Sequence, residues 1–214
     1  MHHVNSGHQS SNNAAHRPDQ QPFFRFLLDI TAYLLIPGFT ILFVRGSNWF
    51  TTNFSVLGND MGRENAFVFW GLLVGIYFFV ILQMISSYLV PPLKTTFFIP
   101  LALLLLVFAI TTPYLPEQLP LKATLHVAFA FLSSVCLAVF LVLLLCDLSR
   151  RIPEAIRLYQ AGLFMILLIS AFLLLAAGIV SSALEIFFTI SITIFCRQLE
   201  KRLFFLCQFL NGKL

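Results

Sequence analysis

The sequence predicts an all-α, polytopic integral membrane protein with six transmembrane helices in one bundle and both termini in the cytoplasm. Hydrophobic residues make up 59% of the chain and charged residues only 10%, and the mean hydropathy is +0.90. A soluble domain has roughly half apolar and a quarter charged residues. The apolar residues gather in six long runs. A helix that crosses a bilayer needs about 20 mostly apolar residues, so each run predicts one crossing.

The first three predicted helices contain proline or glycine within otherwise apolar runs. Pro37 and Pro100 are expected to kink the first and third helices. Gly71 and Gly75 form a GxxxG motif in the second helix, which allows close helix approach. Asp29, about two turns into the first helix, either snorkels beside lipid or has an internal partner. The six predicted helices are Phe23–Val44, Ala66–Val90, Phe97–Tyr114, Leu121–Leu145, Tyr159–Val180, and Ala183 to about Phe195 or beyond.

The sixth run is short, because only about a dozen apolar residues precede Arg197, whereas a full crossing needs about 20. We therefore expect the helix to continue through the segment CRQLEKRLFFLCQFL. In this interpretation Arg197, Lys201 and Arg202 snorkel toward the headgroups, and the apolar residues that follow lie in the interface.

The placement of basic residues predicts the orientation, because short loops rich in Lys and Arg stay on the cytoplasmic side. With both termini inside, ten of the 13 Lys and Arg residues are cytoplasmic, and only Arg45, Arg63 and Lys122 are outside. The reverse orientation would invert this bias. The sequence thus predicts a multi-pass protein of the cell membrane, whose inner basic residues suit an anionic leaflet rather than nucleic acid.

Composition divides the chain into three parts. Residues 1–22 form a polar tail that is predicted to be disordered. Residues 23–196 form the six-span bundle, and residues 197–214 form a basic amphipathic extension at the cytoplasmic surface. No CxxC, HExxH or glycine-rich phosphate loop occurs, and the tail histidines fit no rigid ligand spacing, so neither a metal nor a cofactor is predicted.

Polar candidates for a functional site gather at one depth on the predicted outer side. The first external loop contains NFSVLGNDMGREN, residues 53–65, between two apolar runs. A histidine follows near the outer end of the fourth helix, and a glutamate near the outer end of the sixth. Ionisable groups at membrane depth are costly and count as functional candidates. The candidate site residues are Ser55, Asp60, Arg63, Glu64, His126 and Glu185.

Helical spacing predicts that two polar stripes face the bundle interior. Glu185, Thr189 and Thr193 occur at i, i+4 and i+8, and His126 and Ser133 at i and i+7. The hydroxyl groups are interpreted as interhelical hydrogen-bonding groups. His126 and Glu185 are interpreted as a proton-handling or headgroup-binding pair, in which burial lets one charge neutralise the other.

Two segments resemble a known family. The segment FSVLGNDMGRENAFVFWGLLVG looks like the first loop and second span of a family of bacterial six-helix membrane proteins of unknown function, and PYLPEQLPLKATLHVAFAFLSS is similar to its third loop and fourth span. That family is similar in layout to the Frag/DRAM/Sfk superfamily, which is linked to lipid remodelling and membrane homeostasis. The resemblance makes Ser55, Gly58 and His126 the matching positions, while Val56 stands where the family usually has an acidic residue.

These features predict an outer-leaflet-facing site that binds a lipid headgroup or another membrane protein, with the first loop folded back over the outer mouth of the bundle. No catalytic residue is assigned. One alternative is an intramembrane lipid hydrolase, with Ser55 or Asp60 acting beside His126 as base. The other is a proton-coupled small-solute carrier that uses Glu185 and His126 as its relay, although no charged residue lies near the bilayer midplane.

Overall fold

The computed structural model describes residues 22–59, 62–89 and 94–211, and every regular element within them is a helix. The prediction of an all-α fold is therefore confirmed for this part of the chain. The elements are α1 (Pro22–Ile30), η1 (Thr31–Leu35), α2 (Ile36–Phe43), α3 (Phe54–Asn59), α4 (Glu64–Ser87), η2 (Lys94–Phe97), α5 (Phe98–Thr111), α6 (Pro120–Arg151), α7 (Pro153–Ala177) and α8 (Ser182–Asn211).

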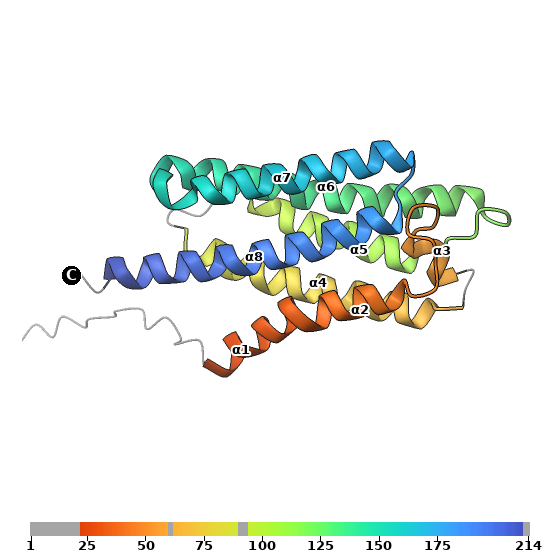
Figure 1. Cartoon of the computed structure of the whole chain (residues 1–214), viewed down its shortest axis with the longest axis horizontal. Helices are drawn as coiled ribbons and strands as arrows, with labels where there is room; N and C mark the ends of the chain where they lie inside the picture. The colour runs from red at the N-terminus through yellow and green to blue at the C-terminus, as the bar shows by residue number, and fades with distance from the viewer. Residues whose placement is uncertain (1–21, 60–61, 90–93, 212–214) are drawn as a thin grey trace, which may run out of the picture.

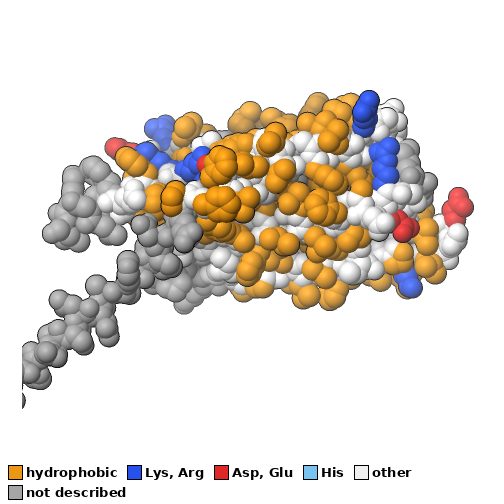
Figure 2. Space-filling model, turned by 90° about the horizontal axis from the view of Figure 1, so that it is seen from below, with side chains coloured by type: hydrophobic (Ala, Val, Ile, Leu, Met, Phe, Trp, Pro, Cys, Tyr) orange, Lys and Arg blue, Asp and Glu red, His pale blue; other side chains and the backbone are white. Residues whose placement is uncertain are grey.

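The long helices lie side by side along one axis (Figure 1). The short helix α3 lies at one end of the bundle, which we call the loop end, and α1 begins at the opposite end, where α8 finishes. On the face drawn in Figure 2, hydrophobic side chains cover the middle of the molecule, and Lys, Arg, Asp and Glu lie toward the two ends. This distribution is typical of a bundle whose middle faces lipid.

Five helical segments are long and apolar enough to cross a membrane. The apolar helix α5 is shorter, with 14 residues, which correspond to about 21 Å of a bilayer core that is about 30 Å thick. Length and composition thus indicate a multi-pass membrane protein. The five segments are Pro22–Phe43, Glu64–Ser87, Pro120–Arg151, Pro153–Ala177 and Ser182–Gln208.

The two prolines that are predicted to kink their helices lie in different positions in the structure. Before Pro37, the chain widens into the π-helical segment η1, in which the Ile36 N–H bonds to the Thr31 carbonyl. This π-helical turn connects α1 to α2 and lies next to a residue that has no N–H to donate. Pro100 instead occupies the first turn of α5, where backbone N–H groups have no partner within the helix. The expectation that Pro100 kinks its helix is therefore wrong.

The predicted close approach at the GxxxG motif is confirmed. A Cβ atom built on Gly71 would lie 2.6 Å from Cγ2 of Ile110 in α5, and one on Gly75 would lie 3.2 Å from Cδ2 of Leu106. The two glycines thus let α5 pack directly against the backbone of α4. Without a hydrophobic effect between helices in lipid, such van der Waals contact is a main source of stability.

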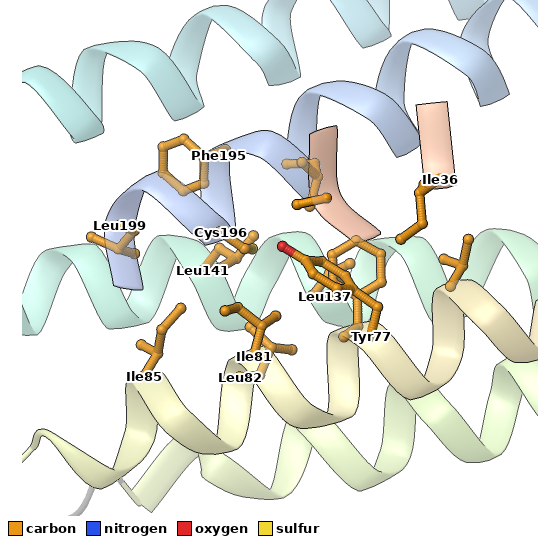
Figure 3. Close-up of a cluster of buried hydrophobic side chains, with 14 of the residues drawn as sticks. Ile36, Tyr77, Ile81, Leu82, Ile85, Leu137, Leu141, Phe195, Cys196 and Leu199 are labelled. Carbon is orange, nitrogen blue, oxygen red and sulfur yellow. The ribbon is translucent and has the colours of Figure 1, made fainter. Parts of the chain in front are cut away.

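The core is formed where α4, α6 and α8 meet (Figure 3). Ile81 and Ile85 of α4 are fully buried there, as are Leu141 of α6 and Leu199 of α8. Tyr77 lies in the same cluster and donates its hydroxyl to the Thr193 carbonyl of α8, at 2.9 Å. This bond links α4 to α8 and satisfies a polar group inside an apolar core.

The helix α7 packs differently from the others. Its buried residues are Ile156 and Leu163, both in its first half. From Leu167 to its end at Ala177, every residue is exposed or only half-buried. Gly178 then ends the helix with φ +69°, a left-handed conformation that favours glycine.

An ionic network links α1 to α8 near the end opposite α3. Arg197 is only 1% exposed, donates from Nε to Oδ1 of Asp29 at 2.7 Å, and pairs with the fully buried Glu200. Arg25 reaches Glu200 at 2.8 Å, and Lys201 reaches Asp29 at 2.7 Å. The expectation that Arg197 snorkels is therefore wrong, because buried charges require partners and α1 supplies them. Of the two alternatives for Asp29, snorkelling beside lipid or bonding to an internal partner, the second is correct, because Asp29 pairs with Arg197 and Lys201.

Candidate functional site

The first loop is built around the short helix α3. Asn53 precedes this helix, and its Oδ1 accepts the N–H of Val56 at 2.8 Å, as a helix N-cap does. Phe54 and Leu57 are fully buried. The Phe54 ring meets the Trp70 ring edge-on, with a centroid distance of 4.8 Å. The loop therefore folds back over the bundle, as the sequence predicts, and is not a solvated spacer.

The same loop is bonded to the beginning of α8. The Ser182 N–H donates to the Thr52 carbonyl at 2.7 Å, which satisfies one of the first N–H groups of α8. In return, Oε2 of Glu185 accepts the N–H of Phe54 at 2.7 Å. The position of α3 is thus set by α8 through a carboxylate and a backbone donor.

Ser55 and His126 form the central contact between α3 and α6. The Ser55 Oγ lies 2.6 Å from the His126 Nε2, and Nδ1 of the same ring lies 2.7 Å from the Thr112 carbonyl oxygen. Because a carbonyl can only accept, Nδ1 carries the hydrogen and Nε2 presents its lone pair to the serine hydroxyl. His126 is 1% exposed and Ser55 is 7% exposed, so the pair is sheltered.

A cavity of about 360 Å³ adjoins this pair, which is within the usual size range of small-molecule sites, about 300–1,000 Å³. Asn53, Ser55, His126 and Glu185 form its polar end. Along α6 the lining extends from His126 to Ala138, which is about 18 Å at about 1.5 Å per residue. That length is a little more than half of a bilayer core about 30 Å thick.

The rest of the cavity wall is mainly apolar. It combines large side chains of α4, α5 and α8 with small residues of α6 and with the second half of α7, the half that has no buried residue. Representative lining residues are Trp70, Leu106, Ala130, Leu167 and Phe188. The cavity thus has a polar group of side chains at the loop end and a mainly apolar wall along its length, where the hydroxyls of Ser133, Ser134 and Ser170 bond to helix carbonyls.

Two other predicted site residues lie apart from this cavity. Arg63 donates to the carbonyl oxygens of Phe43 and Arg45, so it caps the last turn of α2. Glu64 lines a second cavity of about 190 Å³, which also touches His126. The structure thus brings Ser55, His126 and Glu185 together, whereas Arg63 has a helix-capping role. Asp60 lies outside the described residues.

The expected direct pairing of His126 with Glu185 is wrong. The described ion pairs do not include this one, and each side chain instead bonds to a neighbouring residue of α3, His126 to Ser55 and Glu185 to Phe54. The two residues therefore act on the same short helix from two sides.

Sequence reasoning did not find two groups of this site. The Thr112 carbonyl carries no side-chain signal, since every residue has such an oxygen. Asn53 has a signal, because an Asn directly before a short segment is a common N-cap. Among the described residues, no three His, Cys, Asp or Glu side chains gather as a metal site would require.

No known protein family, curated protein or solved structure matches this chain. The function of the site is therefore inferred from its own residues.

Proposed function

We propose that this protein is a six-span protein of the cell membrane that binds a lipid in the cavity beneath α3, from the outer leaflet. The observation that carries the proposal is the shape of the cavity, which has Asn53, Ser55, His126 and Glu185 at one end and a mainly apolar wall over the roughly 18 Å that it follows along α6. A lipid has the same distribution, with polar ester and headgroup atoms at one end of a long apolar chain. A small polar solute would leave most of this wall without a favourable contact.

The charge distribution supports the orientation. Ten of 13 basic residues fall on the side opposite α3 if the chain crosses six times, so the loop end faces outward by the positive-inside rule. The helical segment that contains α5 becomes long enough to cross a bilayer core of about 30 Å when η2 is included. Its four residues add about 8 Å to the 21 Å of α5, which gives about 29 Å.

A proton-coupled carrier has less support. His126 and Glu185, its required relay, do not bond to each other, and each is engaged with α3. A second membrane protein as the partner remains compatible with the exposed apolar faces, but no described contact favours it. The family resemblance to six-helix membrane proteins similar in layout to Frag/DRAM/Sfk is compatible with a lipid ligand and stays a prediction.

Photocrosslinking tests lipid binding directly. The full chain would be reconstituted in vesicles that contain phosphatidylglycerol with a diazirine in one acyl chain, and crosslinked peptides would be mapped. Ala130→Phe fills the cavity and should lower crosslinking at least tenfold. Ala176→Phe, on an exposed part of α7 outside the cavity lining, is the matched control and should crosslink like the wild type. Equal crosslinking of both variants would overturn the proposal.

A further inference from the structure

The geometry points to Ser55 as the nucleophile of an acyl-transfer step, with His126 as its general base, that cleaves the ester of a lipid held in the cavity. This inference rests on the proposed lipid binding. The Ser55 Oγ and His126 Nε2 are 2.6 Å apart, within the distance at which a base activates a serine. The Thr112 carbonyl lies 2.7 Å from Nδ1 and so fixes the tautomer and the orientation of the ring, which is one of the two tasks of the carboxylate in a Ser-His-Asp triad.

The other serines of the cavity show why Ser55 differs from a packing hydroxyl. Ser133 donates to the Ala102 carbonyl, Ser134 to its own helix at Ala130, and Ser170 to its own helix at Ile166. These are the usual ways in which a hydroxyl is satisfied in a membrane helix. Among the four described serines that line the cavity, Ser55 is the one whose hydroxyl meets a base.

A donor for the developing negative charge lies in the same wall. The Val56 N–H donates to Oδ1 of Asn53, and this bond distinguishes the oxygen of the Asn53 side-chain amide from its nitrogen. The Nδ2 hydrogens of Asn53 are therefore donors. Asn53 lines the cavity together with Ser55. An amide N–H is the kind of donor that stabilises the oxyanion of acyl transfer, and Asn53 is the residue of the cavity wall that we assign to this role.

The reaction balances with an ester and water. The Ser55 oxygen attacks the ester carbonyl carbon while its proton passes to Nε2 of His126, and the tetrahedral intermediate then breaks the bond to the alcohol oxygen, which takes that proton. The products of this first half of the reaction are an acyl-serine and a free alcohol. Water next attacks the acyl-serine and gives a proton to His126, the carboxylic acid leaves, and the proton returns to Ser55.

A long-chain alkyl fluorophosphonate tests this step on the full chain in detergent. The wild type should form an adduct on the peptide that contains Ser55, with loss of fluoride, and Ser55→Ala should form none. His126→Gln keeps a polar contact but is not a base, so labelling should slow by about 100-fold or more. Ser47→Ala removes a hydroxyl of the same loop that bonds to the Val44 carbonyl, outside the cavity, and should label normally.

Photocrosslinking of the same preparations separates the two proposals. His126→Gln should still crosslink the diazirine lipid, which shows that the variant is folded. A wild-type chain that crosslinks the lipid yet gives no Ser55 adduct would overturn the acyl-transfer step and leave lipid binding intact. Labelling at an unchanged rate in His126→Gln would overturn the role of the base. A wild-type chain that crosslinks no lipid would overturn lipid binding itself.

Discussion

Replacing Glu200 by Gln removes the charge at the centre of the ionic network while keeping the size of the side chain. Glu200 is fully buried and pairs with Arg25 and Arg197. The network holds three basic and two acidic residues, a net charge of +1, because Asp29 and Lys201 complete it. Without the Glu200 charge the net becomes +2, and Arg25 loses its acidic partner. Breaking a buried pair costs about 3–5 kcal/mol, and the lower end applies because Arg197 keeps Asp29.

Thermal unfolding of the purified chain in detergent measures this cost. At about 2–4 °C per kcal/mol for a chain of this size, a loss of about 3 kcal/mol lowers the midpoint by about 6–12 °C. Asp147→Asn is the matched control, since Asp147 pairs with Arg151 one turn away and both side chains are about a third exposed. Such a pair contributes about 0.3–0.5 kcal/mol, so the midpoint should fall by no more than about 2 °C. Equal shifts for the two variants would refute the reasoning.

Three further changes test the packing and the topology. Phe54→Ala leaves a space beneath the loop and should cost about 3–5 kcal/mol in detergent unfolding, whereas Phe50→Ala, at a residue 57% exposed, should cost little. Gly71→Val pushes α5 away from α4 and should lower stability by about 1–3 kcal/mol in the same assay; an unchanged midpoint would contradict the close contact. Glu117→Cys should react with an impermeant thiol reagent on intact cells and Glu154→Cys should not, and labelling at the second position would exclude the proposed orientation.

The helices, and the end of the bundle at which the site lies, could be predicted from the sequence because both depend on local pattern. Apolar runs predict where the helices lie, and the positions of His126 and Glu185 near the ends of two such runs predict that both side chains lie at one end of the bundle, where they line the same cavity. The second helix was expected over Ala66–Val90 and is observed over Glu64–Ser87. The apolar composition of this segment predicted that a helix is present, but it predicted the two ends of the helix only approximately. Capping interactions, and not hydrophobicity, determine where a helix stops.

The contacts of charged residues could not be predicted in the same way. Asp29 and Arg197 are 168 positions apart, and nothing in either segment indicates that α1 and α8 are neighbours. Arg63 had the charge and depth of a ligand-binding residue, yet it caps α2, because a guanidinium bonds to helix carbonyls as readily as to an anion. Sequence pattern places such groups along the helix axes, and only packing selects their partners.

The exposure of the second half of α7, which has no buried residue, has a consequence for how a ligand enters the cavity. Leu167, Ser170 and Leu174 line the cavity on one side of this segment, while its other side carries exposed apolar residues such as Phe172. An outward tilt of this segment about its first half would separate no fully buried side chain of α7, since Ile156 and Leu163 lie below it. For a cavity that binds lipid as proposed, we expect acyl chains to enter between α6 and the second half of α7. A crosslink that ties α6 to the second half of α7 would then slow lipid exchange while leaving α3 and its bonds unchanged.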